Sequence, residues 1–474
     1  MSYTGADWAL ACGRWATRYL NGLSFDIIMP GVWVLFYMLC VFANAVVLVK
    51  MWNIRGGASV CLLSFILAVN PAVIEQSLLQ YMFLAWGLSN LFSLIFVYIS
   101  IGSESRLARY MLAPLLMALA FGFYQASVGT ICMAFCAALI IRLLSGTELR
   151  KIIITVLRFL LSSMIGLLLY FAVFKYELGR YGVEESGRVQ EFSVSKILGS
   201  LGETIPQAYS SFYNFFSDYF FYRKSLYMLM FGLMLVFFAF RLTKLMREKR
   251  FAGAGAAVTL FCLMPLAANI TKVIFPDTEI KTLMQYQNVF VVPFLFSLAE
   301  MEGPERNVFI NAGRCLSCLL LASLCWGYTV SANATYSVYE LSYRHMNFMT
   351  GSILNRVYSM PEYSEGDTIV FAGFVDDSEL RANVTAYKFA YGQYDNLVYW
   401  VDAGTGLRQS RNNYLLNYFG FSGGYIRGTM HGDYNSAVTS PEFMDMGIYP
   451  EENSIKKFGN MIIVKLAEQP PLFD

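Results

Sequence analysis

The sequence predicts a polytopic α-helical membrane protein with about ten spans, followed by a small α/β domain at the C-terminal end. Hydrophobic residues make up 57% of the 474-residue chain and charged residues only 14%, whereas a soluble domain usually carries about a quarter charged residues. The apolar residues also gather into long runs that end near residue 331. Lipid must therefore surround most of the chain, and the net charge of +2 gives no reason to expect a nucleic-acid partner.

Residues 1–30 precede the first apolar run and predict an amphipathic segment in the membrane interface. Aromatic and charged side chains recur there at helical spacing, which is typical of helices that lie between water and lipid. The motifs are Asp7-Trp8, Gly13-Arg14-Trp15 and Arg18-Tyr19. A plain membrane anchor explains them as well as a site does. In the functional interpretation, Asp7 faces a cavity and acts as a base.

Residues 31–333 are expected to form the transmembrane domain. A span needs about 20 apolar residues, fewer where helices pack against one another. The apolar runs lie at 31–50, 57–72, 80–101, 109–123, 127–144, 153–174, 225–241, 252–271, 286–300 and 311–331.

Basic residues predict the orientation of these spans, because cytoplasmic loops carry an excess of lysine and arginine. Counted along the chain, the basic clusters all fall on one face, which we expect to be cytoplasmic. The basic residues are Lys50, Arg55, Arg106, Arg109, Arg142, Arg150, Lys151, Arg241, Lys244, Arg247, Lys249, Arg250, Arg306 and Arg314. The opposite face then receives residues 1–30, a long loop at 175–224 and the C-terminal domain.

An N-terminus on that face with no apolar run before it is unusual. A start site placed too late, with a first membrane helix lost, would account for it.

Two polar hinges interrupt the spans on the outer face. The first, Asn70-Pro71 to Gln76, holds the carboxylate Glu75, and ionisable groups near membrane depth usually mark a site or pathway. The second holds Tyr124 and Gln125, whose amide can bind a ligand. Capping of helix ends is an equally good explanation for both hinges.

Cations on the outer face are candidate partners for a phosphate group. Arg180 lies in the long loop and Lys272 in the loop that follows the eighth run. Arginine and lysine side chains are common ligands of phosphate oxygens. The alternative is that each side chain only reaches toward lipid headgroups.

Residues 334–474 have ordinary composition and predict a soluble α/β domain on the outer face. Strands are expected at 368–374 and 460–466, with helices near 336–358 and 377–390. No histidine, cysteine or acidic residues stand at metal-ligand spacing, so we expect no metal and no cofactor.

In their order along the chain, these motifs resemble the Gtr-type O-antigen glucosyltransferases of bacteria, the serotype-converting enzymes of the GT-C class. The resemblance covers nearly the whole chain. It rests on the Asp7-Trp8 to Trp15 segment, the Asn70-Pro71 to Glu75 hinge, the Tyr124-Gln125 hairpin, the long outer loop and the C-terminal domain. Relatives often carry an acidic pair where this chain has Ala6-Asp7.

The resemblance implies a GT-C-like fold and transfer of a sugar, with glucose the first choice, from a polyprenyl-phosphate carrier to a lipopolysaccharide O-antigen or another surface glycan. It places the protein in the bacterial inner membrane with its active site on the periplasmic face. Asp7 is then the expected base, with Glu75 as its alternative. The expected donor-binding residues are Arg14, Tyr124, Gln125, Arg180 and Lys272. The partners are the lipid-linked donor, the glycan acceptor and the bilayer.

Two other functions fit the pattern of spans. An O-antigen polymerase-like enzyme also has many spans and a large outer loop, but does not obviously need a soluble C-terminal domain. A transporter or flippase of lipid-linked sugars predicts internal repeats, and the sequence contains no convincing repeat.

Overall fold

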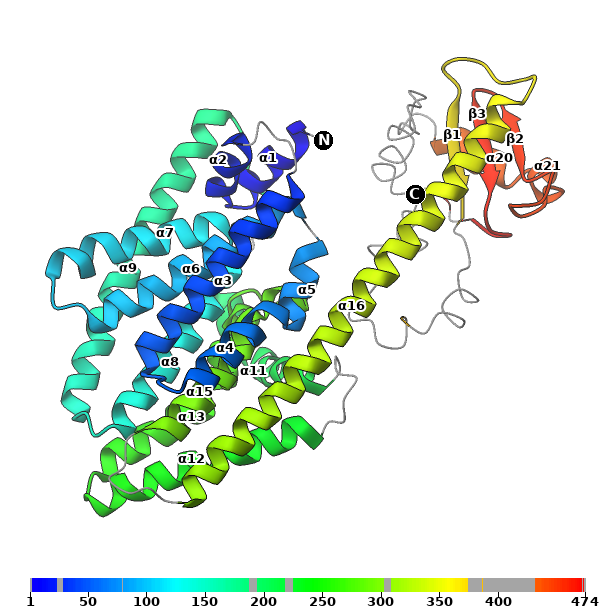
Figure 1. The fold of residues 1–474 in the computed structure, drawn as a ribbon. Helices are drawn as coiled ribbons and strands as arrows, with labels where there is room; N and C mark the ends of the chain where they lie inside the picture. The colour runs from blue at the N-terminus through cyan, green and yellow to red at the C-terminus, as the bar shows by residue number, and fades with distance from the viewer. Residues whose placement is uncertain are drawn as a thin grey trace. The chain divides into compact units, whose positions relative to one another are not determined.

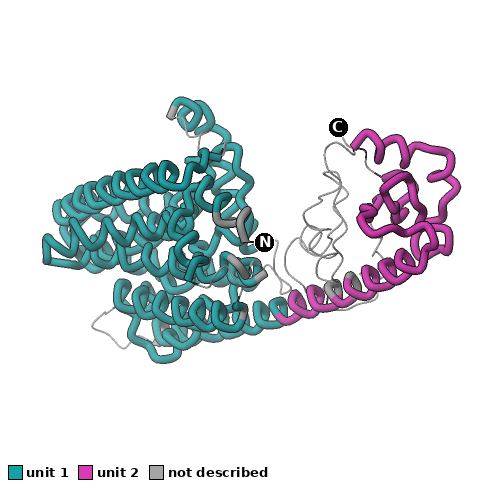
Figure 2. Tube along the Cα trace, turned by 90° about the horizontal axis from the view of Figure 1, so that it is seen from above, with its two compact units in different colours: residues 1–332 teal, residues 333–474 magenta. Residues whose placement is uncertain are grey.

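The structure, a computed structural model, describes residues 2–23, 29–78, 80–186, 194–217, 225–301, 308–373, 386, 431–470 and 472. The chain divides into two compact units, residues 1–332 and residues 333–474 (Figure 2). The described part of the first unit is helical, and the sheet belongs to the second unit (Figure 1).

Fifteen α-helices lie wholly or partly within the described part of the first unit. In chain order they are α1 (Ser2–Ala11), α2 (Trp15–Leu23), α3 (Pro30–Trp52), α4 (Gly57–Val69), α5 (Pro71–Leu78), α6 (Gln80–Gly102), α7 (Ala113–Phe123), α8 (Val128–Leu144), α9 (Leu149–Tyr181), α11 (Val194–Ser217), α12 (Ser225–Arg247), α13 (Phe251–Ala268), α14 (Ile270–Ile274), α15 (Val291–Glu300) and α16 (Val308–Tyr358). A π-turn, η1 (Ala108–Leu112), precedes α7. The short 3₁₀ turns are η2 (Gln125–Ser127), η3 (Thr282–Met284) and η4 (Tyr286–Phe290).

The polytopic helical fold is confirmed, with fewer full-length spans than the expected ten. Seven helices in the described part of the chain are long and apolar enough to cross a membrane, or eight if the bent pair α4 and α5 forms one broken span. Run 109–123 contains an α-helix of 11 residues, and run 286–300 contains one of 10. At about 1.5 Å per residue, each covers roughly half of the hydrocarbon thickness.

The long outer loop predicted at 175–224 contains more helix than the sequence indicated. Helix α9 continues to Tyr181, and α11 occupies Val194–Ser217. One face of α11 is apolar and packs against α13 and α14. The chain enters and leaves α11 through residues 187–193 and 218–224, which lie outside the described residues.

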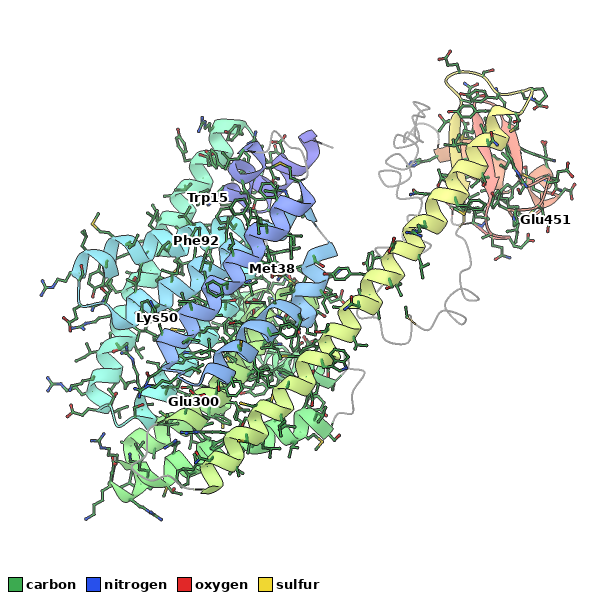
Figure 3. The ribbon with its side chains drawn as sticks, viewed as in Figure 1. Trp15, Met38, Lys50, Phe92, Glu300 and Glu451 are labelled. Carbon is green, nitrogen blue, oxygen red and sulfur yellow. The ribbon has the colours of Figure 1, made fainter. Side chains whose placement is uncertain are left out.

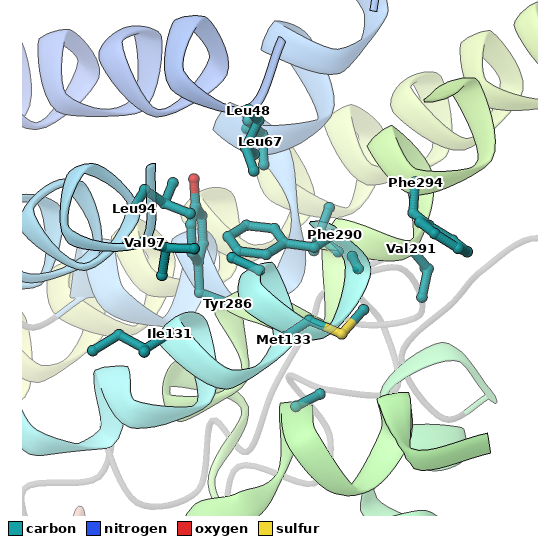
Figure 4. Close-up of a cluster of buried hydrophobic side chains, with 14 of the residues drawn as sticks. Leu48, Leu67, Leu94, Val97, Ile131, Met133, Tyr286, Phe290, Val291 and Phe294 are labelled. Carbon is teal, nitrogen blue, oxygen red and sulfur yellow. The ribbon is translucent and has the colours of Figure 1, made fainter. Parts of the chain in front are cut away.

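A large buried core holds the helices of the first unit together. Helix α6 packs against α3 and α7, α7 packs against α9, and α8 packs against α13. Tyr286 and Phe290 of η4 lie within this core beside side chains from α3, α4, α6 and α8 (Figure 4). The irregular turn is therefore buried among helices, which is how non-helical backbone is tolerated at membrane depth.

Arginines gather at one end of the first unit, which we call the basic end. Each donates to a backbone carbonyl at or near the C-terminal end of a helix. The donations run from Arg142 to Ile101 at 3.2 Å, from Arg241 to Leu298 at 3.2 Å, from Arg314 to Ala299 at 2.8 Å, and from Arg250 to Gly146. The last carbonyls of a helix have no partner within it, and its C-terminus attracts cations. Basic clusters that are far apart in sequence therefore meet at the basic end.

The N-terminal helices lie at the opposite end, which we call the outer end. Figure 3 shows Trp15 there, with Lys50 and Glu300 toward the basic end. Trp15 belongs to α2, which packs against α6 and α7. The segment expected to be one amphipathic helix is thus two helices, and both pack against the bundle.

The second unit contains a three-stranded sheet in the order β1-β3-β2. Strand β1 (Thr368–Ala372) runs parallel to β3 (Met461–Lys465), and β2 (Ile455–Phe458) runs antiparallel to β3. The predicted strands at 368–374 and 460–466 therefore pair directly. The predicted helix at 336–358 is the C-terminal part of α16, whereas the one at 377–390 lies outside the described residues except for residue 386.

Helices cover both faces of this sheet. Ile369 and Phe371 of β1 point to one face, where they pack against Ile353 and Val357 of α16. Val370 points to the other face and packs with α20 (His431–Val438) and α21 (Pro441–Met444). Alternate residues of a strand face opposite sides, so helices on both faces of the sheet bury every residue of β1. The second unit is a small α/β domain.

Candidate functional site

A glycine separates the two N-terminal helices at the outer end. Gly13 has a φ of +81°, a conformation that L-residues other than glycine rarely adopt. A Cβ atom at this position would lie 2.4 Å from the Tyr170 hydroxyl and 2.5 Å from Nε2 of Gln125. Gly13 therefore permits both the sharp turn between α1 and α2 and the close approach of two polar side chains.

Those side chains attach the turn to the bundle. Nε2 of Gln125 donates to the carbonyl of Cys12 at 2.6 Å, and the Tyr170 hydroxyl of α9 donates to the carbonyl of Gly13 at 3.1 Å. The hydroxyl of Thr17 in α2 donates to the carbonyl of Phe123 at 3.2 Å. Gln125, predicted to bind the donor, thus holds the backbone that carries the site.

Replacement of Gly13 by alanine is expected to lower both the melting temperature and the activity. The left-handed conformation costs roughly 1–2 kcal/mol for other residues, and overpacking adds about 1–3 kcal/mol. Gly182→Ala is the matched control, because Gly182 also has a positive φ of +64° but open space around its Cβ position. Equal losses in the two variants would show that the contacts at Gly13 do not matter.

Asp7, the predicted base, forms an ion pair that joins α1 to α2. We call these two helices and the turn at Gly13 the N-terminal hairpin. Its Oδ1 lies 2.6 Å from Nη1 of Arg18, and the two side chains are 29% and 22% exposed. The Arg18 guanidinium also stacks on the Tyr181 ring of α9, 3.6 Å from its centroid. The carboxylate is therefore held in one place at the protein surface while part of it remains accessible.

Arg14 lies between two aromatic rings. Its guanidinium carbon is 5.2 Å from the centroid of the Trp8 ring and 5.0 Å from that of Tyr124. Among the residues that the structure describes, Arg14 forms no ion pair, and its buried Nε has no hydrogen-bond partner. Aromatic faces attract a cation without neutralising it. No carboxylate among the described residues balances the charge of Arg14.

Arg180 belongs to the same outer end. Its Nη1 lies 3.9 Å from Oε1 of Glu177, one turn earlier in α9, and 3.4 Å from the hydroxyl of Tyr19 in α2. Burial and the Glu177 carboxylate raise the pKa of Tyr19 to about 12, so this phenol stays protonated. Of the five predicted site residues at this end, Asp7, Arg14 and Arg180 carry charge, and Tyr124 and Gln125 support them.

The other two predicted residues belong to a second group around the loop that leads from α14 to η3. One carboxylate oxygen of Glu75 accepts a hydrogen bond from the Leu283 amide at 2.6 Å. Nζ of Lys272 donates to the carbonyls of Pro276 at 2.8 Å and Thr278 at 3.2 Å. Both side chains organise this loop.

Sequence reasoning missed three residues that build the outer end, namely Arg18, Tyr170 and Glu177. Arg18 was visible in the N-terminal motif, but its pairing with Asp7 depends on the turn at Gly13. Tyr170 lies in an apolar run and Glu177 in a segment taken for loop, so neither had a clear signal. In the described part of the chain, no three histidine, cysteine or acidic side chains gather as metal ligands.

Comparison with known protein families identifies one family. The family model described as glucosyl transferase GtrII matches residues 1–292, which include both N-terminal helices, both hinges and the loop around Lys272. No curated protein and no solved structure matches the chain. Because the matched region is more than half of the chain, the protein belongs to the GtrII glucosyl transferase family.

Proposed function

We propose that this glucosyltransferase moves glucose from a polyprenyl-phosphate carrier to a lipopolysaccharide O-antigen or another surface glycan. The observation that carries the proposal is that the N-terminal helices α1 and α2, with the turn between them, carry both an accessible carboxylate, Asp7, and a cation, Arg14, that forms no ion pair among the described residues. A sugar phosphodiester needs a base for the incoming hydroxyl and a cation for the departing phosphate. The family match favours sugar transfer over the polymerase and transporter alternatives.

The reaction gives one role each to Asp7, Arg14 and Arg18. The acceptor oxygen bonds to the anomeric carbon of glucose as the bond from that carbon to the phosphate oxygen breaks. The phosphate leaves with the electron pair and is stabilised by Arg14. The hydroxyl proton passes to Asp7. Arg18 holds the Asp7 carboxylate in place through Oδ1, which assigns Oδ2 to the acceptor hydroxyl.

The arginines of the basic end support a periplasmic location for the site in the bacterial inner membrane. Positive charge marks the cytoplasmic side of such a protein, and Arg142, Arg241, Arg250 and Arg314 share the end opposite Asp7. An enzyme facing the periplasm works without nucleotide sugars, which agrees with a lipid-linked donor.

A reporter fused after Asp474 is expected to show a non-cytoplasmic C-terminus. This follows if the basic end is cytoplasmic and the α16 span leads away from it. Paired fusions to alkaline phosphatase, which is active outside the cytoplasm, and to a fluorescent protein that is active inside it measure the location. Fluorescence with no phosphatase activity would contradict the orientation.

Analysis of the cell-surface glycan tests the function. Bacteria that express the chain and make polyprenyl-phosphate glucose are expected to gain a new terminal glucose on the glycan, detected by linkage analysis. The gain is expected to disappear when synthesis of the lipid-linked glucose is blocked. A new terminal glucose that persists under the block would contradict this donor.

A further inference from the structure

Glu177 is a carboxylate that the proposed reaction does not use. It lies near the end of α9, an apolar helix of 33 residues, and is only 4% exposed. Its Oε2 is buried and has no hydrogen-bond partner in the described part of the chain. Ionisable groups next to an apolar span are costly and usually mark function, so this residue calls for a role.

The contacts of Glu177 lead to the N-terminal hairpin, which carries Asp7. Its carboxylate interacts electrostatically with the Tyr19 hydroxyl and raises the pKa of that group. Arg180 lies 3.9 Å from the same carboxylate and 3.4 Å from that hydroxyl. Tyr19 is the next residue after Arg18 in α2, and Arg18 binds Asp7 at 2.6 Å.

A second path runs through Tyr181. The guanidinium of Arg18 lies 3.6 Å from the centroid of this ring, and that of Arg180 lies 5.3 Å from it. Two carboxylates and two arginines thus follow one another around α2 and the end of α9, in the order Asp7, Arg18, Arg180 and Glu177. The Tyr181 ring lies between the two arginines. Helix α9 is fixed by its packing against α7, so it provides a rigid reference for α2.

We propose that Glu177 is a positioning residue, which holds Asp7 at the reacting centre through Tyr19 and Arg18. This inference rests on the proposed function. Glu177 itself is too buried to meet an acceptor hydroxyl, whereas the Asp7 side chain is 29% exposed. Misplacement of a catalytic group by about 1 Å can cost 10²-fold in rate, so a carboxylate that fixes α2 affects the chemical step without touching the substrate.

A double-mutant cycle tests this role. Glu177→Gln, Tyr19→Phe and the double variant are compared in proteoliposomes that contain labelled polyprenyl-phosphate glucose and acceptor glycan. Each single variant is expected to lower kcat by roughly 10-fold or more, with KM for the donor within about 2-fold of the wild type. The double variant is expected to match the single ones, because both changes break one interaction.

Matched controls separate positioning from general damage. Tyr213 is an exposed tyrosine of α11, and Glu340 is an exposed carboxylate of α16 paired with Arg344. Tyr213→Phe and Glu340→Gln are expected to keep wild-type kcat. All variants are measured per amount of folded protein, determined by size-exclusion chromatography.

Each outcome decides the proposal. Transfer by the wild type with unchanged kcat in Glu177→Gln would overturn the positioning role and leave the proposed function standing. The proposal would also be overturned if the fold-losses in kcat of the two single variants multiplied in the double variant. A change in KM with no change in kcat would overturn it too. If the wild type itself transfers no glucose from this donor, the proposed function fails and the positioning role fails with it.

Discussion

Asp7→Asn is expected to lower the rate of glucosyl transfer by about 10²- to 10⁴-fold, the usual contribution of a general base. Asparagine has nearly the same shape as aspartate, and its Oδ1 can still accept from Arg18, which binds Asp7 at 2.6 Å. The N-terminal hairpin should therefore stay folded, and the amount of protein in the membrane should stay at the wild-type level. Transfer rates and membrane protein levels measure the two effects.

Asp277→Asn is the matched control for this substitution. Asp277 also forms an ion pair, with Lys196, and its side chain is 57% exposed. Because it lies in the loop after α14, its loss is expected to change the transfer rate by less than about 2-fold, as for other exposed ion pairs. Full activity of Asp7→Asn would remove Asp7 as the base and direct attention to Glu75.

Arg14→Gln is expected to raise KM for the lipid-linked donor by roughly 10- to 100-fold. A hydrogen bond to a charged group contributes about 1.5–3 kcal/mol, and Arg14 has no ion-pair partner among the described residues. Arg14→Lys is expected to recover only part of the affinity, because lysine keeps the charge but lacks the planar group that lies between Trp8 and Tyr124. Steady-state kinetics with varied donor concentration measure both variants.

Arg344→Gln provides the control for loss of an exposed arginine. Arg344 forms an ion pair with Glu340 on the surface of α16 at 2.6 Å, and exposed pairs of this kind contribute little. The Arg344→Gln variant is expected to have the same KM for the donor as the wild type. If Arg14→Gln also has the wild-type KM, Arg14 does not bind the donor, and Arg180 and Lys272 remain as candidates.

Composition and periodicity predicted most of the fold because a segment that crosses lipid must be apolar and must satisfy its backbone hydrogen bonds as a helix. Each apolar run corresponds to a helical segment, and the strand that begins at Thr368 pairs with the one that begins at Met461. The number of full spans was harder to predict. Run 286–300 is mostly apolar, but its first part is a 3₁₀ turn buried among other helices.

The site was predictable only as a set of residue types. Asp7 and Arg14 stood out because charges are rare near an apolar run. Their partners depend on tertiary structure, since Arg18 reaches Asp7 only after Gly13 reverses the chain. Lys272 shows the opposite case, because a cation that looked free in sequence donates to two carbonyls of its own loop. Glu177 was hidden because α9 extends farther than its apolar run.

Transfer by the purified protein tests the central claim most directly. The wild type is reconstituted in proteoliposomes with labelled polyprenyl-phosphate glucose and acceptor glycan, and labelled glucose in the glycan is measured over time. The proposed function predicts steady transfer from this donor in the absence of any nucleotide sugar. Transfer from uridine diphosphate glucose alone, with none from the lipid-linked donor, would contradict it.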